Sequence, residues 1–133
     1  MSDIHEDIDN EIEQEFLKSW DSTENFFIDH SPYKDKDSAE SMLWLIEELR
    51  KRGYDKKLRA GVALNSLKMS RSKKHKLRTN QPFLAIHVLP DGRLEYTFKG
   101  RTDGRIFSLR TGKLEISQEV NDLLTELAAS EID

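Results

Sequence analysis

The stretch "QPFLAIHVLPDGRLEYTFKGRTDGRIFSLRTGKLEI", residues 81–116, decides the fold of this chain of 133 residues. It opens with an apolar run, turns at Pro90-Asp91-Gly92 and continues with alternating apolar side chains, which is the pattern of a β-hairpin. Later turns at Asp103-Gly104 and Thr111-Gly112 divide the remainder into one or two further short strands. Because consecutive strands joined by turns pair antiparallel, the stretch predicts a β-meander of three or four strands.

Helical patterns precede the meander. Asp37 and Glu40 resemble a capping box, and Gly53 stands where a left-handed residue ends a helix, so a helix is predicted from about residue 38 to residue 52. Asp55 is then predicted to cap a second helix that runs into a basic stretch. The apolar face of this second helix would consist of small and branched side chains: Ala60, Ala63, Leu64 and Leu67.

The first twenty residues carry a narrow apolar ridge between acidic side chains. Its residues recur every four positions, as on one face of an amphipathic helix: Ile4, Ile8, Ile12, Phe16 and Trp20. Two interpretations stay open, since this acidic helix either docks on the domain's own core or is loosely attached and engages a partner. Residues 21–37 are predicted to be a polar connection, anchored to the core by Phe26, Phe27 and Ile28.

A C-terminal helix follows the meander. Ser117 is its predicted cap, and its apolar stripe is expected to pack on the sheet: Val120, Leu123, Leu124 and Leu127. The order of elements predicts an α+β fold in which helices cover one face of an antiparallel sheet, in a single domain over residues 1–133. Much of the core is expected to come from ten residues: Leu45, Ile46, Leu49, Leu64, Ile86, Tyr96, Phe98, Leu123, Leu124 and Leu127.

Charge is strongly segregated along the chain. Residues 1–50 have a net charge of −11, residues 51–78 of +10 and residues 79–133 of −3, although the whole chain carries only −4. The middle block contains six cations within eleven positions: Lys68, Arg71, Lys73, Lys74, Lys76 and Arg78. A local patch of this kind binds anions even when the whole molecule is acidic.

These patterns predict a small binding or regulatory module without catalytic activity. Closely spaced cations gain affinity for phosphates by releasing counterions, so the six cations are predicted to contact an anionic partner, with nucleic-acid backbone slightly preferred over an acidic protein. Aromatic side chains are absent between Tyr54 and Phe83, which favours backbone contact over base readout. The basic run as a merely solvated surface is the simplest alternative.

Two other interpretations of binding follow from the helices. The acidic ridge, Ile4 to Trp20, would serve a protein-interaction adaptor if it engages a partner. A DNA-binding helix-turn-helix around Gly53 fits less well, because the charges gather beyond the C-terminal half of the second predicted helix instead of at its N-terminus.

A small nuclease is the third functional class. Small ribonucleases also combine helices with an antiparallel sheet that bears His, Glu, Arg and Tyr, and here His87 and Glu95 would have to converge as base and acid. A two-residue turn at Asp91-Gly92 would place His87 opposite Tyr96 and direct Glu95 to the other face. This predicted register argues against catalysis.

No cofactor and no metal are predicted. The four histidines, His5, His30, His75 and His87, stand far apart, and the chain contains no cysteine. The acidic start differs from a signal peptide, and no apolar run has the length of a membrane span. The chain is therefore expected to be a cytoplasmic protein that spans no membrane.

Overall fold

The computed structural model describes residues 10–73, 81–100 and 106–132, and its elements confirm the α+β class. Two helices, α1 (Asn10–Asp29) and α2 (Lys36–Lys51), and a short 3-10 helix, η1 (Tyr54–Lys56), come first. The strands are β1 (Arg59–Ala63), β2 (Ser66–Ser70), β3 (Phe83–Val88), β4 (Arg93–Lys99) and β5 (Ile106–Lys113), and α3 (Gln118–Ala128) follows them. Within these residues the meander has five antiparallel strands in the order β1-β2-β3-β4-β5, not three or four.

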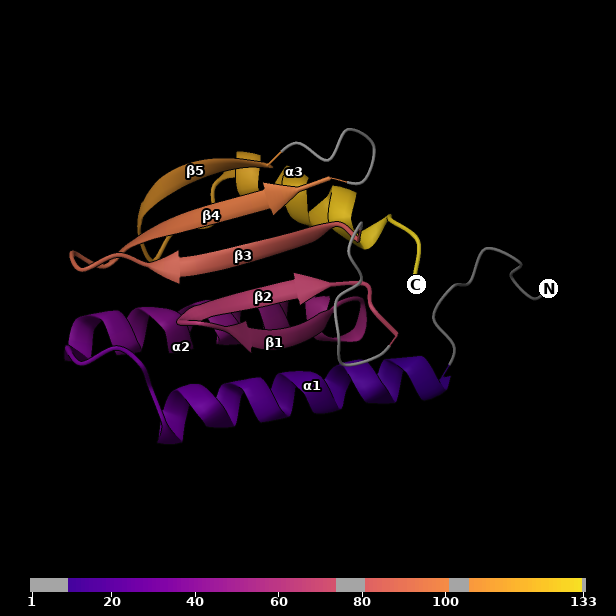
Figure 1. The fold of residues 1–133 in the computed structure, drawn as a ribbon, viewed down its shortest axis with the longest axis horizontal. Helices are drawn as coiled ribbons and strands as arrows, with labels where there is room; N and C mark the ends of the chain where they lie inside the picture. The colour runs from indigo at the N-terminus through magenta and orange to yellow at the C-terminus, as the bar shows by residue number, and fades with distance from the viewer. Residues whose placement is uncertain (1–9, 74–80, 101–105, 133) are drawn as a thin grey trace.

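Alternation along the strands gives the sheet two different faces. In β3 the side chains of Leu84, Ile86 and Val88 are buried, while those between them are half-buried. Helices α2 and α3 pack on the buried face and lie behind the sheet in Figure 1. The hydrophobic core fills the space between this face and the helices. Nine of the ten predicted core residues are buried there, and the exception is Leu64, which is 95% exposed.

Helix α1 runs along the outer edge of β1 (Figure 1). The indole Nε1 of Trp20 donates a hydrogen bond to the carbonyl of Leu58 at 2.8 Å, and the hydroxyl of Ser19 accepts one from the N–H of Ala60 at 2.9 Å. Trp20 and Phe16 are completely buried. Because these contacts use the polar groups of an edge strand, α1 protects β1 from pairing with another chain.

The predicted end of the first helix at residue 20 and the predicted loop over residues 21–37 are wrong. Helix α1 continues to Asp29, because Thr23 and Phe27 extend the buried ridge of Trp20 at helical spacing. Helix α2 begins two residues earlier than predicted. Its N-cap is Asp35, whose carboxylate accepts a hydrogen bond from the N–H of Ser38 at 2.8 Å.

The predicted second helix after Asp55 is also wrong, because residues 59–70 form the β1–β2 hairpin. Leu67 and Met69 alternate with polar residues, as in a strand, and both are fully buried against β3. A helix here would have left the edge of β3 without a partner. The helix-turn-helix interpretation is excluded by the same observation, since a strand follows Gly53 and η1.

Candidate nucleic-acid interface

The turn between β3 and β4 determines which side chains share a face of the sheet. The N–H of Gly92 donates to the carbonyl of Leu89 at 2.8 Å, and the N–H of Leu89 donates to the carbonyl of Arg93 at 2.8 Å. The loop therefore contains three residues, Pro90 to Gly92. Proline in the second turn position and Gly92 at a φ of 87° fit a type I turn followed by a left-handed residue. The predicted two-residue turn is wrong.

The longer loop moves the pairing of β3 with β4 by one residue. His87 stands directly opposite Glu95, and Ile86 stands opposite Tyr96. Side chains of directly opposite residues lie on the same face, so His87 and Glu95 share one face while Tyr96 points into the core and is only 1% exposed. The prediction that the register separates His87 from Glu95 is therefore wrong.

We name the side of the sheet that α2 and α3 leave uncovered the open face; it is turned toward the viewer in Figure 1. Cross-strand register places its residues in neighbouring rows. The open face includes Lys68, Phe83, Ala85, His87, Glu95, Thr97, Lys99, Ser108 and Arg110, together with the exposed Ile106 opposite Lys99.

One end of the open face is cationic. The ammonium of Lys68 lies 4.3 Å from the centroid of the Phe83 ring, and Lys99 stands opposite Phe83 on the neighbouring strand. Burial, and after it the charge of Lys99, lowers the pKa of Lys68. The two ammonium groups, on the strands that flank β3, thus repel each other. This arrangement favours an anion that lies between them.

The other end of the open face combines acid, base and cation. Arg110 Nε donates to Glu95 Oε2 at 3.0 Å, and the hydroxyl of Tyr33 lies 3.5 Å from Nδ1 of His87. Between the two ends lies a row of small side chains, in which the hydroxyls of Thr97 and Ser108 are 3.3 Å apart. The middle of the face is consequently low, because none of these side chains is long.

The structure describes three of the six predicted cations. Lys68 lies on the open face, Lys73 is exposed just after β2, and Arg71 is buried with 5% of its surface accessible. The other three lie outside the described residues: Lys74, Lys76 and Arg78. The composition of the run did not indicate Phe83, Lys99 or Arg110. In β3 and β4, residues that face the core alternate with residues that face away from it. This alternation is the signal that would have revealed Phe83 and Lys99.

Arg59 fixes the backbone where the chain leaves β2. Its Nε donates to the carbonyl of Ser72 at 2.8 Å and its Nη2 to the carbonyl of Lys73 at 2.6 Å. Its guanidinium also lies 5.8 Å from the centroid of the Phe16 ring. Burial lowers the pKa of Arg59, and the nearby charge of Glu15 opposes this shift. Arg59 therefore serves to hold the exposed Lys73 in position.

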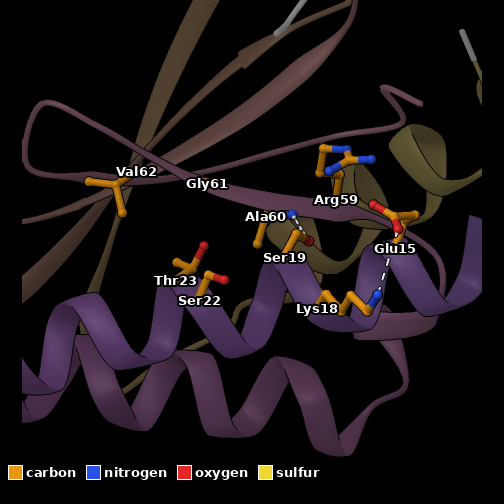
Figure 2. Close-up of a pocket in the computed structure, with 9 residues that line it drawn as sticks. All are labelled: Glu15, Lys18, Ser19, Ser22, Thr23, Arg59, Ala60, Gly61 and Val62. Atoms are coloured by element: carbon orange, nitrogen blue, oxygen red, sulfur yellow. Dashed lines mark hydrogen bonds and ion pairs between the residues drawn. The ribbon is translucent and has the colours of Figure 1, made fainter. Parts of the chain in front are cut away.

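A second concave surface lies between α1 and β1 (Figure 2). This groove has a volume of about 590 Å³ and is lined by residues 15, 18, 19, 22 and 23 of α1 and residues 59–62 of β1. Its charged side chains contact other groups of the protein, since Lys18 pairs with Glu15 at 3.9 Å and Arg59 donates hydrogen bonds to backbone carbonyls. The groove thus offers less to an anion than the open face.

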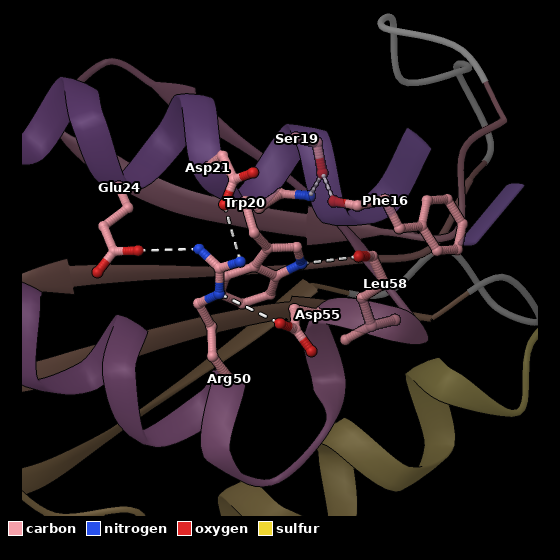
Figure 3. Close-up of polar contacts among 9 residues, drawn as sticks. Phe16, Ser19, Trp20, Asp21, Glu24, Arg50, Asp55 and Leu58 are labelled. Carbon is pink, nitrogen blue, oxygen red and sulfur yellow. Dashed lines mark hydrogen bonds and ion pairs between the residues drawn. The ribbon is translucent and has the colours of Figure 1, made fainter. Parts of the chain in front are cut away.

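A cluster of charges around Arg50 joins three elements (Figure 3). Arg50 forms ion pairs with Asp21 at 2.9 Å, Glu24 at 2.8 Å and Asp55 at 3.2 Å. The guanidinium of Arg50 therefore binds three carboxylates of the protein itself and links α2 to α1 and η1. We assign this cluster a structural role.

The apolar ridge of the first helix is largely internal. Phe16 and Trp20 are fully buried in the core and Ile12 is half-buried, while Ile4 and Ile8 lie outside the described residues. In this arrangement Phe16 and Trp20 are not accessible to a partner.

Comparison of the chain with protein-family models, with curated proteins and with solved structures found no match. Among the described helices, none is long and apolar enough to cross a lipid bilayer. In the described part of the chain, no group of three or more His, Asp or Glu side chains is arranged to hold a metal ion. Function is therefore argued from the open face itself.

Proposed function

We propose that this protein is a small module that binds the phosphate backbone of a nucleic acid through the open face. The observation that carries the proposal is the pair of lysines, Lys68 on β2 and Lys99 on β4, on the strands that flank Phe83 of β3. Burial is the larger cause of the lowered pKa of Lys68, and a phosphate between the two lysines would offset the second cause, the charge of Lys99, and would release counterions from the strand.

A single strand fits this surface better than a duplex. The ammonium of Lys68 lies over the half-buried ring of Phe83, so a base would stack on this ring once Lys68 turns to a phosphate of the backbone. The low row of Ala85, Thr97 and Ser108 leaves room for a chain to cross the sheet. The open face thus combines the two features that bind single strands without sequence preference, which are a cationic path and an aromatic platform.

The adaptor hypothesis is less well supported. It depends on an accessible apolar ridge, and the two largest side chains of that ridge, Phe16 and Trp20, lie in the core. A cytoplasmic location remains part of our proposal, because a chain without cysteine suits a reducing compartment in which nucleic acid is present.

The proposal is tested by fluorescence anisotropy with a labelled single-stranded oligodeoxynucleotide. The double variant Lys68→Glu/Lys99→Glu should bind at least about tenfold more weakly than the wild type, because it replaces attraction by repulsion at two phosphates. Lys51→Glu/Lys56→Glu is the matched control, since it makes the same charge change at exposed residues of α2 and η1. Circular dichroism verifies that both variants fold.

Salt and a ring substitution sharpen this test. The logarithm of the wild-type binding constant should fall with the logarithm of salt concentration, with a slope of about −0.7 for each phosphate contacted. Phe83→Leu keeps apolar bulk but removes the aromatic ring, so it should weaken binding without changing that slope. Equal loss of affinity in the open-face double variant and in its control would refute the proposal.

A further inference from the structure

His87 and Glu95 bring a proton donor and a proton acceptor to the same surface as the cations. They are direct cross-strand partners on β3 and β4, at the end of the open face opposite Lys99. Directly opposite residues have Cβ atoms about 4.5–5.5 Å apart, so one small group lies within reach of both side chains. Both side chains are half-buried and therefore accessible from solvent.

Tyr33 orients the imidazole of His87. Its hydroxyl donates its proton to the carbonyl of Asn65 and accepts a hydrogen bond from the N–H of Val88 at 3.2 Å. Toward Nδ1 of His87, 3.5 Å away, the same hydroxyl is left to act as an acceptor. A proton on Nδ1 would be directed at this acceptor, which would leave Nε2 as the nitrogen that faces a substrate.

Arg110 places a cation beside the carboxylate of Glu95. Only Nε of Arg110 is used in the ion pair with Glu95 Oε2, at 3.0 Å, and 58% of the arginine side chain is exposed. A guanidinium has five N–H donors, so others remain for the oxygens of a phosphate. A phosphodiester bound by Arg110 would therefore lie next to both Glu95 and His87.

We propose that the open face cleaves RNA by transesterification, in which the phosphorus of a phosphodiester passes from the 5′-oxygen to the neighbouring 2′-oxygen. Glu95 is the general base and His87 is the general acid. This inference rests on the proposed binding of nucleic acid to the same face. It adds an activity that the sequence-based register had argued against.

The reaction is balanced within the substrate and these two side chains. The carboxylate of Glu95 takes the proton of the 2′-hydroxyl, and the 2′-oxygen forms a bond to phosphorus while the bond from phosphorus to the 5′-oxygen breaks. The imidazolium of His87 gives the proton on Nε2 to the leaving 5′-oxygen. The products are a 2′,3′-cyclic phosphate and a free 5′-hydroxyl. Arg110 stabilises the charge that gathers on the phosphoryl oxygens.

The substrate class follows from this chemistry. DNA has no 2′-hydroxyl and would bind the open face without being cut. Single-stranded RNA is the expected substrate, because its nucleotides can adapt to a flat sheet and place the 2′-oxygen in line with the leaving group.

The experiment uses the full chain and one sequence in three forms: RNA, DNA, and RNA with a single 2′-deoxynucleotide at the position where the RNA form is cut. Wild-type protein should convert the RNA to fragments that end in a 2′,3′-cyclic phosphate, leave the DNA intact and fail at the 2′-deoxy position. His87→Gln and Glu95→Gln should each lower the cleavage rate by at least about 100-fold, since general acid–base groups contribute about 10² to 10⁴. Both variants should still bind the DNA form, Glu95→Gln at least as tightly as the wild type because it removes a negative charge beside Arg110.

Matched controls are His30→Gln and Glu119→Gln, which make the same changes at exposed residues of the loop after α1 and of α3. Both should retain the wild-type rate. Equal cleavage by His87→Gln, Glu95→Gln and wild type would identify a contaminating nuclease and overturn the inference. DNA binding without any RNA cleavage would also overturn it while leaving the proposed function intact, whereas absence of binding to every form would refute the proposed function itself. The 2′-deoxy substrate tests the reaction on unaltered protein, whatever the stability of the variants.

Discussion

The positive φ of Leu64 shows that the chain turns at this residue, where the sequence predicted a helix. Leu64 has a φ of 57°, stands at the tip of the β1–β2 hairpin and is 95% exposed. A left-handed conformation costs a residue with a Cβ atom about 1–2 kcal/mol, and the flanking strands impose it here. At Gly92 the same conformation has no such cost, and there the glycine fixes the register that brings His87 opposite Glu95.

Tyr96 makes the stability of the fold decrease with rising pH in the alkaline range. Its hydroxyl donates to the carbonyl of Glu115 at 2.9 Å, and burial raises its pKa from 10.0 to about 12. The folded state holds this proton more tightly than the unfolded state, so the stabilisation is complete below about pH 10 and is lost as the pH rises toward about 12.

The measurement is urea unfolding of wild type and Tyr96→Phe at increasing pH. Between about pH 10 and pH 12, the free energy of unfolding of the wild type should fall by up to about 3 kcal/mol more than that of the variant. Each unit of pKa shift corresponds to about 1.4 kcal/mol. Parallel curves for the two proteins would show that Tyr96 does not carry the effect.

At the scale of elements, helix α1 packs along the outer strand of the sheet, β1. Hydrogen bonds join Trp20 to Leu58 just before β1 and Ser19 to Ala60 in β1, and the ion pairs of Arg50 hold α1 against α2 and η1. These contacts protect one edge of the meander and hold α1, and with it Phe16 beside Arg59, against the sheet. None of the described helices covers the open face, because α1 lies at the edge and α2 and α3 lie on the opposite side.

We expect Arg50→Lys to lower the free energy of unfolding by about 1–2 kcal/mol. A lysine ammonium cannot reproduce the planar fork that reaches three carboxylates at once, and the arginine side chain is only 22% exposed. Arg52→Lys is the control, because Arg52 forms one longer ion pair, with Glu48 at 3.7 Å, and is more exposed. It should change stability by less than about 0.5 kcal/mol. Urea unfolding followed by tryptophan fluorescence measures both, and similar losses would contradict this account.

At the scale of the whole molecule, the acidic and basic blocks of the sequence lie close to each other where α1 packs against β1. The charge of Glu15 acts on Arg59, and Arg59 in turn holds the backbone of Lys73. An acidic segment near a cationic surface competes with phosphates for the same charges. Removing all of residues 1–20 would also remove Phe16 and Trp20 from the core, so a deletion that tests this competition must end before Asn10.

Deletion of residues 1–9 removes four acidic side chains: Asp3, Glu6, Asp7 and Asp9. We expect the shortened protein to bind a labelled oligonucleotide several-fold more tightly at low salt, and the difference should disappear at high salt as the charges are screened. A full-length protein with Asn or Gln at the four positions should behave like the deletion if charge is the cause. Tighter binding of the deletion alone would refute the electrostatic explanation.

Local patterns in the sequence were sufficient for several elements. The alternation in residues 83–99 predicted β3 and β4, and capping residues with periodic leucines predicted α2 and α3, because each of these signals involves neighbours along the chain. The α+β class and nine of the ten predicted core residues followed from them. Of the candidate site, only Lys68 was identified as a functional residue.

The tertiary structure alone decided the rest. Residues 59–70 carry apolar side chains compatible with a helix or a hairpin, and pairing of β2 with β3 selects the hairpin because it buries Leu67 and Met69. The register of β3 and β4 depends on a loop of three residues where two were predicted, and one residue changes which side chains share a face. Alternation in β3 and β4 indicates single members of the open face, but which of them stand opposite one another depends on strand register, and a one-residue difference in a loop changes that register.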